Sequence, residues 1–170
     1  IKLIIDSLFE GLATRIPSPI HPRKSYFNKD LKPVDFSIEE AKNILQKDGW
    51  KDSNSNGILD KTIDGRIQEL QFDLLTSQRK LGQDLALIFQ QNAEKVGIRI
   101  DISAIDNATL ISNVRNREFD MANLAGRFPV QSDEEQLYIT WHSDATATGG
   151  NNFMNFRNSQ VDSLIQLARS

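Results

Sequence analysis

The sequence predicts an α/β fold in which a strand-helix-strand unit lies within a mixed sheet flanked by helices. Residues 98–103 alternate apolar and polar side chains, as a half-buried strand does, and residues 70–75 are predicted as a second strand. Between them, apolar residues recur at helical spacing from Arg79 to Val96, and Gly97 ends the pattern. Two strands separated by one helix are expected to be parallel, with a right-handed crossover.

The composition limits the classes of protein that this chain can represent. Its 170 residues, 39% hydrophobic and 25% charged, suit one globular domain, and we expect residues 1–170 to form it. The net charge is −3 without a long run of one sign, so a nucleic-acid partner is not expected. The chain has no cysteine, which excludes disulfides and thiolate metal sites. No apolar run approaches the roughly 18 residues that cross a bilayer, so we expect a soluble domain.

Both ends of the chain have helical patterns. The first nine residues form an apolar pattern without an initiating Met, and residues 163–169 continue a helix without a stop signal. We interpret the chain as a fragment of a longer protein. Residues 11–33 carry four of the five prolines, and we expect an extended surface segment there.

Capping and turn signals place the remaining elements. Ser37 and Glu40 form a capping box that begins a helix, and Gly49 ends it so that Trp50 folds back. The buried stripe of this helix is predicted at Ile38, Ala41, Ile44 and Leu45, and that of the 79–96 helix at Leu81, Leu85, Ile88, Phe89 and Val96. Further predictions are a hairpin turn at Asp64-Gly65, a helix capped by Asp106 that bears Leu110, Ile111 and Val114, a strand at 119–125, a short helix at 137–141 and a closing helix from Ser159.

One stretch has the spacing of a calcium-binding loop. Oxygen-bearing side chains occupy the first, third, fifth and ninth positions of an EF-hand-type pattern, namely Asp52, Asn54, Asn56 and Asp60. Gly57 stands at the sixth position, but the twelfth position is Ile63, where a bidentate carboxylate is required. We therefore predict an Asn-Gly turn and keep a Ca²⁺ site as the alternative.

The sequence offers no catalytic constellation, and we expect neither an enzyme nor a cofactor. The two histidines, His21 and His142, lack the spaced partners of a zinc site, and both are expected at the surface. Residues 142–144 are the three residue types of a hydrolase triad. Because triad partners come from separate elements, three consecutive residues are not expected to form one. Neither a phosphate-binding loop nor a dinucleotide fingerprint is present.

Segments in a fixed order along most of the chain resemble the extracellular solute-binding proteins of family 5, the peptide/nickel class of ABC importer receptors. The matching stretches are residues 34–45 with Gly49-Trp50, residues 65–75, residues 85–98, Phe119-Asp120-Met121, and residues 152–165. This resemblance implies a periplasmic-binding-protein-like II lobe, specifically a fragment of the C-terminal lobe of a two-lobed receptor.

The resemblance also implies a function and its partners. Such a receptor is periplasmic or lipid-anchored at the cell surface, acts as a monomer and closes its two lobes on an oligopeptide or another small solute. It then delivers the solute to the membrane permease of an ABC importer. The missing N-terminal lobe is thus an implied partner. The alternatives are a self-contained interaction or calcium-binding module, and a hydrolase or transferase.

The candidate ligand-binding residues are Arg127, Phe128 and Asn152. Ligands of open α/β sheets bind beyond the carboxyl ends of strands, which directs attention to residues 126–131. In the family, a Trp usually follows the Gly of this loop, and in oligopeptide binders an Asp holds the ligand's amino terminus. Here Arg127 and Val130 stand at or beside those positions, and an arginine favours a carboxylate.

Each candidate also has a structural interpretation. Arg127 would form a surface ion pair, Phe128 would belong to the core, and Asn152 would stabilise its Gly-rich loop.

Overall fold

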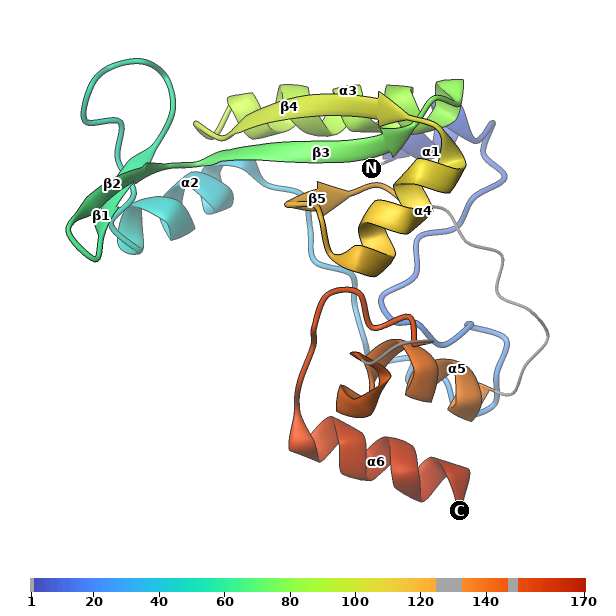
Figure 1. The fold of residues 1–170 in the computed structure, drawn as a ribbon. Helices are drawn as coiled ribbons and strands as arrows, with labels where there is room; N and C mark the ends of the chain where they lie inside the picture. The colour runs from blue at the N-terminus through green and yellow to red at the C-terminus, as the bar shows by residue number, and fades with distance from the viewer. Residues whose placement is uncertain (1, 125–132, 147–149) are drawn as a thin grey trace. The chain divides into compact units, whose positions relative to one another are not determined.

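The computed structural model describes residues 2–124, 133–146 and 150–170 (Figure 1). Contacts between residues are concentrated in two compact units. The sheet unit comprises Asp35–Ala125, and the helical unit comprises Ile1–Val34 with Gly126–Ser170. That residues 1–170 form a single domain stays a prediction.

A three-stranded parallel sheet forms the centre of the sheet unit. Its strands are β3 (Gln71–Ser77), β4 (Arg99–Ile105) and β5 (Met121–Ala122), in the order β4-β3-β5. Both pairings are parallel, and Leu74 pairs with Ile102 on one side and Met121 on the other. The predicted parallel pair is confirmed, whereas the strand predicted at 119–125 shortens to two residues.

Helix α3 (Lys80–Glu94) packs on one face of this sheet and completes the predicted strand-helix-strand unit. The core contains Leu74, Ile100, Ala86 and Ala93. The helix thus places alanines against the sheet, while Leu81 and Phe89 of the predicted stripe are 41% and 45% exposed. The prediction was wrong for these two residues, because small side chains let the helix approach the strands closely.

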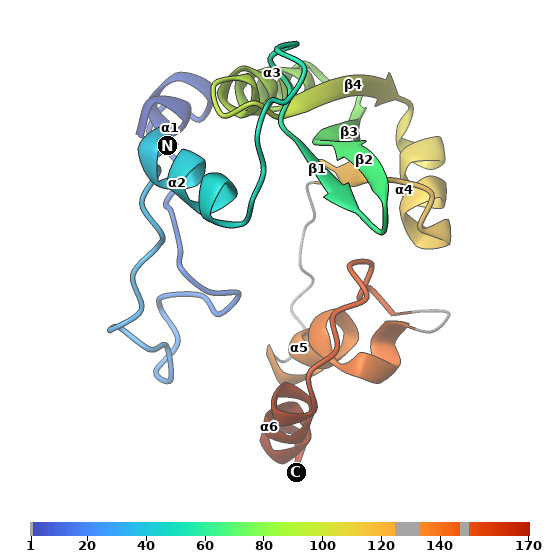
Figure 2. The same cartoon turned by 90° about the vertical axis from the view of Figure 1, so that its left-hand side faces the viewer.

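Helix α4 (Asn107–Asn116) lies on the opposite face of the sheet (Figure 2). Leu110 and Val114 are buried as predicted, whereas Ile111 is 40% exposed, against the prediction. The Asp106 carboxylate caps the helix by accepting from the backbone N–H groups of residues 108 and 109, both at 3.0 Å. The Thr109 hydroxyl, the largest cause, and these N–H groups hold the pKa of Asp106 below its ordinary value.

A separate two-stranded sheet precedes β3. It consists of β1 (Asp60–Ile63) and β2 (Arg66–Glu69), which pair antiparallel. Asp64 and Gly65 between them have φ angles of 50° and 76°. Two consecutive positive φ values define the predicted type I′ turn. Antiparallel and parallel strands therefore occupy two sheets.

Helix α2 (Ile38–Lys47) begins and ends as predicted. The Ser37 hydroxyl accepts from the backbone N–H of Glu40 at 3.1 Å, and Trp50 N donates to Leu45 O at 3.0 Å beyond Gly49. Its predicted apolar stripe is not buried, however, and Ile44 is 58% exposed. An open groove of about 440 Å³ lies between α2 and the end of α3, and α2 lines it with Lys42 and Gln46 rather than with the stripe.

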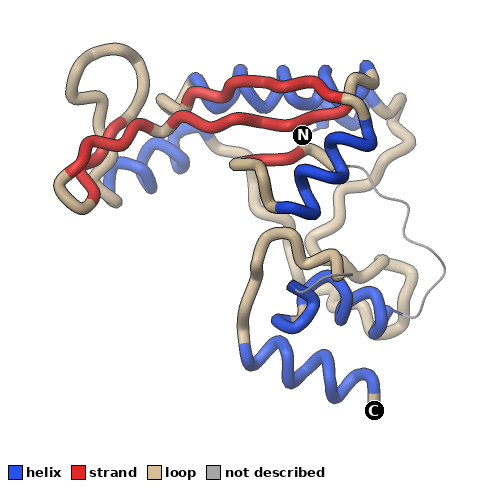
Figure 3. The backbone as a smooth tube through the Cα atoms, viewed as in Figure 1, coloured by secondary structure: helices blue, strands red, loops and turns tan. Residues whose placement is uncertain are grey.

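The helical unit contains α1 (Lys2–Leu8), α5 (Asp133–Trp141), the 3₁₀ turn η1 (Ser143–Thr146) and α6 (Ser159–Arg169), and α5 packs against α6 (Figure 3). Residues 12–37 form neither a helix nor a strand, as expected for the proline-rich segment. Asn158 caps α6 by accepting from Gln160 N and Val161 N. Within the described ranges, no helix has the length and apolar character to cross a membrane.

Candidate functional site

The three parallel strands end at one edge of the sheet, which we call the carboxyl edge. It consists of residues 76–79 at the end of β3 and directly after it, Ile105 of β4, Asn123 after β5, and residues 80–82 in the first turn of α3. The register places Ser77 beside Ile105 and Leu75 beside Ala122, so the strands finish together. In open α/β sheets, ligands bind beyond such an edge.

The start of α3 gives the carboxyl edge a positive character. Arg79 is the N-cap residue, with extended backbone angles (φ −70°, ψ 139°), and it makes no side-chain cap hydrogen bond. Because none of the described side chains is seen to cap this helix start, N–H groups of its first turn are positioned for an anionic ligand. The Arg79 side chain is exposed beside them, whereas the exposed Lys80 pairs with Asp84 at 2.8 Å. The arrangement suits a carboxylate.

Asn123 ties β5 to the start of α3. Its backbone N–H donates to Leu75 O at 2.8 Å, which continues the ladder between β5 and β3. Its Nδ2 donates to Gly82 O at 3.1 Å and lies 3.4 Å from the hydroxyl of Thr76, which is fully buried. The amide therefore fixes three parts of the carboxyl edge relative to one another.

Gly82 permits the close approach of α3 to the end of β3. A Cβ at this position would lie 2.7 Å from Ser77 Oγ and 3.0 Å from Thr76 Oγ1. Cβ atoms essentially never lie 2.7 Å from another heavy atom, so any larger residue here forces Ser77 or the helix to shift. Sequence reasoning missed both Gly82 and Asn123. The available signal was a glycine in the first turn of a helix, where glycine is unfavourable.

Two of the three predicted ligand-binding residues, Arg127 and Phe128, lie outside the described residues. The chain enters their stretch directly from the carboxyl edge, after Asn123 and Leu124. Their contacts with a ligand therefore stay predictions.

The third, Asn152, lies in the helical unit and is 1% exposed. Its Nδ2 donates to His142 O at 3.1 Å and to Phe156 O at 2.8 Å, and its Oδ1 accepts from Phe156 N at 2.9 Å. The side chain thus stabilises the loop between α5 and α6. Ligand contact by Asn152 stays a prediction.

In the candidate calcium-binding loop, residues 52–60, side-chain oxygens accept hydrogen bonds from the backbone N–H groups of the same loop. Asp52 accepts from Asn56 N at 3.1 Å and from Gly57 N at 2.9 Å, and the Asn56 side chain accepts from Ile58 N at 2.8 Å. The Asn54 oxygen also accepts from Asn56 N at 3.1 Å. These are the bonds of the predicted Asn-Gly turn.

Asp60 closes the same loop. Its carboxylate accepts from the Ser53 backbone N–H and hydroxyl, each at 2.8 Å. The backbone N–H, as the largest cause, and the hydroxyl lower the pKa of Asp60. Across the described residues, no three His, Cys, Asp or Glu side chains are grouped so that they could hold a metal ion.

The prediction that both histidines lie at the surface is wrong for His142. His21 is exposed, but His142 is 6% exposed. Its Nδ1 accepts from Asp144 N at 3.1 Å, and its ring lies 4.5 Å from that of Tyr138. Packing of α6 against α5 buries the ring. The Ser143 hydroxyl and backbone N–H both interact with Asp162, outside residues 142–144, so these three residues are not arranged as a triad.

The parallel sheet with helices on both faces defines an α/β lobe, and ligands of such open sheets bind beyond the carboxyl edge. Comparison with known proteins agrees, because the family model for bacterial extracellular solute-binding proteins, family 5 (middle region), matches residues 1–148. The chain belongs to this family.

Individual relatives cover different parts of the chain. The oligopeptide-binding protein AppA of Bacillus subtilis is 28% identical over 98% of this chain and 30% of its own length. The nickel-binding protein NikA of Staphylococcus aureus is 32% identical over 61% of this chain and 18% of its own. The chain therefore spans less than a third of these relatives.

Solved structures show the same fold. AppA in complex with a nonapeptide matches with a TM-score of 0.81 and 26% identity, over 99% of this chain and 33% of that protein. NikZ of Campylobacter jejuni in complex with Ni(L-His) also has a TM-score of 0.81, at 23% identity, over 99% of this chain and 33% of that protein. The second match supports the fold alone.

Proposed function

We propose that this chain is part of the substrate-binding component of an ABC importer. It contributes one wall of a cleft in which a small solute is held by closure of two lobes and then delivered to a membrane permease. The second wall comes from the N-terminal lobe, outside these 170 residues. The complete receptor is a monomer in the periplasm or anchored at the cell surface by lipid, and it captures its solute without catalysis.

The observation that carries this proposal is the carboxyl edge of the sheet. It combines uncapped N–H groups at the start of α3 with the exposed Arg79 and with Asn123, which holds the edge together. The edge leads directly into the stretch with Arg127 and Phe128, to which we assign ligand contacts. Asn152 contributes to the proposed binding component by stabilising, through its amide, the loop between α5 and α6.

We propose that the solute is an oligopeptide bound at this edge by its carboxyl terminus. Arginine and helix N–H groups favour a carboxylate over an ammonium group. The match with an oligopeptide-binding relative spans 98% of this chain, and the solved structure of that relative holds a nonapeptide, which supports a peptide as the solute.

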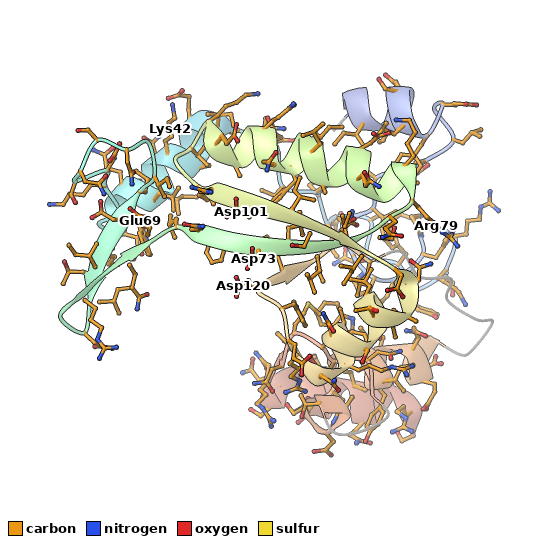
Figure 4. The ribbon with its side chains drawn as sticks, turned by 45° about the horizontal axis from the view of Figure 1, so that its top comes forward. Lys42, Glu69, Asp73, Arg79, Asp101 and Asp120 are labelled. Carbon is orange, nitrogen blue, oxygen red and sulfur yellow. The ribbon has the colours of Figure 1, made fainter. Side chains whose placement is uncertain are left out.

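The test is calorimetric titration of the full-length protein with short peptides that end in either a carboxylate or an amide. Arg79→Ala should weaken binding of the carboxylate peptide by roughly tenfold or more, because a charge-assisted hydrogen bond is lost. The matched control is Lys42→Ala, since Arg79 and Lys42 lie at opposite ends of the sheet unit (Figure 4). It should change the affinity by less than about twofold.

Three results would contradict the proposal. Absence of peptide binding to the full-length protein rejects the peptide as solute. Equal affinities of wild type and Arg79→Ala, or equal binding of the carboxylate and amide peptides, reject the carboxyl edge as the site for the peptide's carboxyl terminus.

A further inference from the structure

The helical unit contains an apolar groove of about 360 Å³ between α5 and α6. Its walls include Leu137 and Trp141 of α5, Val161, Leu164 and Ile165 of α6, and Phe156. Trp141 and Phe156 meet edge to face, with ring centroids 5.7 Å apart. None of the described residues that line the groove carries a charge.

The groove follows a continuous stripe on α6. Positions 161, 164, 165 and 168 line it at the i, i+3, i+4, i+7 spacing of one helix face. The described residues of the unit cover only part of this face, because Ile165 is 5% exposed while Leu164 is 65% exposed. A single exposed leucine is ordinary, but one that borders an apolar groove extends an apolar surface of the kind that marks an interaction site.

The lining does not suit a polar solute. Sites for small molecules place a few polar groups among apolar ones to fix the orientation of the ligand. Here the aromatic and aliphatic side chains of α5 and α6 offer only apolar contact apart from the Trp141 ring nitrogen. A peptide with its charged termini and backbone groups would lose hydrogen bonds to water in such a groove without replacement.

Relatives of this chain supply a candidate for the apolar cover. This chain matches only 30% of the length of AppA, so most of such a protein lies outside the matched region. We propose that an apolar segment of the full-length protein, from outside residues 1–170, occupies the groove and packs against Leu164 and Trp141. The groove is then a packing surface within the receptor. This proposal rests on the proposed function, in which the chain is one part of a longer receptor.

The test uses single cysteine variants of the full-length protein, labelled with a maleimide and quantified by peptide mass spectrometry. Leu164→Cys places the thiol at the groove. Gln160→Cys, at an exposed position one turn earlier on α6, is the matched control. We expect Leu164→Cys to react at least about tenfold more slowly than Gln160→Cys, with equal rates after unfolding in urea.

Each other outcome overturns the proposal. Equal rates in the folded protein mean that the groove is open to solvent. Protection that disappears on dilution identifies a second copy of the protein as the cover, and protection that appears only with added peptide identifies a solute. If Leu164→Cys does not fold, hydroxyl-radical footprinting of the wild type replaces it, and we expect Leu164 to be protected by a factor of at least about ten relative to unfolded protein. A protection factor near one for Leu164 would contradict the proposal.

The two proposals fail separately. Leu164 lies in the helical unit, and the Arg79 titration probes the sheet unit. A receptor that binds peptides with an exposed Leu164 keeps the proposed function and loses this inference. If Leu164 is protected but the receptor binds no peptide, this inference stands and the proposed function is lost.

Discussion

Asp73 and Asp101 are direct neighbours across the parallel pair of strands β3 and β4. Asp101 is paired with Arg99 at 3.2 Å and accepts a hydrogen bond from Gln71 at 2.8 Å. Asp73 is exposed, and its backbone N–H donates to the carboxylate of Asp120 at 3.0 Å. Three carboxylates therefore lie near one another on the sheet unit (Figure 4).

Like charges directly opposite each other on adjacent strands destabilise a sheet. We therefore expect Asp73→Asn to raise the free energy of unfolding by roughly 0.2–1 kcal/mol. Urea denaturation at low and high salt measures the effect, and the gain should shrink at high salt, where charges are screened. Asp101→Asn is the matched control and should give no gain, because it weakens the contact with Arg99. A loss of stability in Asp73→Asn would refute this explanation.

Gly82 gives the second prediction. In an exposed helix an Ala would be more favourable than a Gly, but here its Cβ would lie 2.7 Å from Ser77 Oγ. We expect Gly82→Ala to destabilise the protein by about 1–3 kcal/mol, as overpacking does, and to weaken peptide binding by moving the start of α3. Thermal unfolding and peptide titration measure the two effects.

The double variant Gly82→Ala with Ser77→Ala tests the cause. Removing the Ser77 hydroxyl eliminates the shortest contact, so part of the lost stability should return. The contact with Thr76 Oγ1 at 3.0 Å remains, so the recovery is incomplete. If Gly82→Ala stabilises the protein instead, helix propensity outweighs the close contact and our account of the carboxyl edge is wrong.

The third prediction concerns pH. The Ser53 N–H and hydroxyl lower the folded-state pKa of Asp60 below its ordinary value of 3.8. A lowered carboxyl pKa stabilises the fold above the unfolded pKa, and this contribution is lost as the pH falls through the folded pKa. The difference in stability between wild type and Asp60→Asn should therefore be largest near about pH 7 and decrease below about pH 4.

Unfolding midpoints in urea across this pH range measure the difference. Ser53→Ala removes the hydroxyl and keeps the backbone N–H, so it should reduce the pH dependence without abolishing it. A difference between wild type and Asp60→Asn that is constant with pH would show that the charge of Asp60 does not contribute.

Local signals in the sequence predicted much of the fold. The Asp106 cap, the Asp64-Gly65 turn and the glycine after α3 each act through their immediate neighbours, so residue type and spacing suffice. The wrong predictions concern burial. Ile44 is exposed and His142 is buried, because burial depends on which distant element packs against a residue. On α3 the prediction placed large apolar side chains against the sheet, but small ones such as Ala86 are buried there.

The candidate site was less predictable for a related reason. Because ligands of open α/β sheets bind beyond the strand ends, the sequence predicted a site in the residues that follow β5. The structure adds Arg79 and Gly82 from the start of α3, which lie 40 residues or more earlier in the chain. The parallel register brings these ends together. Spacing along the sequence does not contain that information, and neither residue has a local pattern that indicates a ligand.

Asn152 gives the last prediction, and it separates two roles for one residue. If the buried amide stabilises its loop, Asn152→Ala removes three hydrogen bonds to the backbone and should cost roughly 2–4 kcal/mol of stability. Peptide affinity of the protein that remains folded should change little. Thermal unfolding and calorimetry on the same preparation measure both.

The matched variant Asn152→Asp isolates the donor. A carboxylate still accepts from Phe156 N but cannot donate to the carbonyl oxygens of His142 and Phe156, which its oxygens would then face in a buried site. We therefore expect Asn152→Asp to be at least as destabilising as Asn152→Ala at neutral pH. Normal stability in either variant together with a loss of peptide affinity would instead establish Asn152 as a ligand-binding residue.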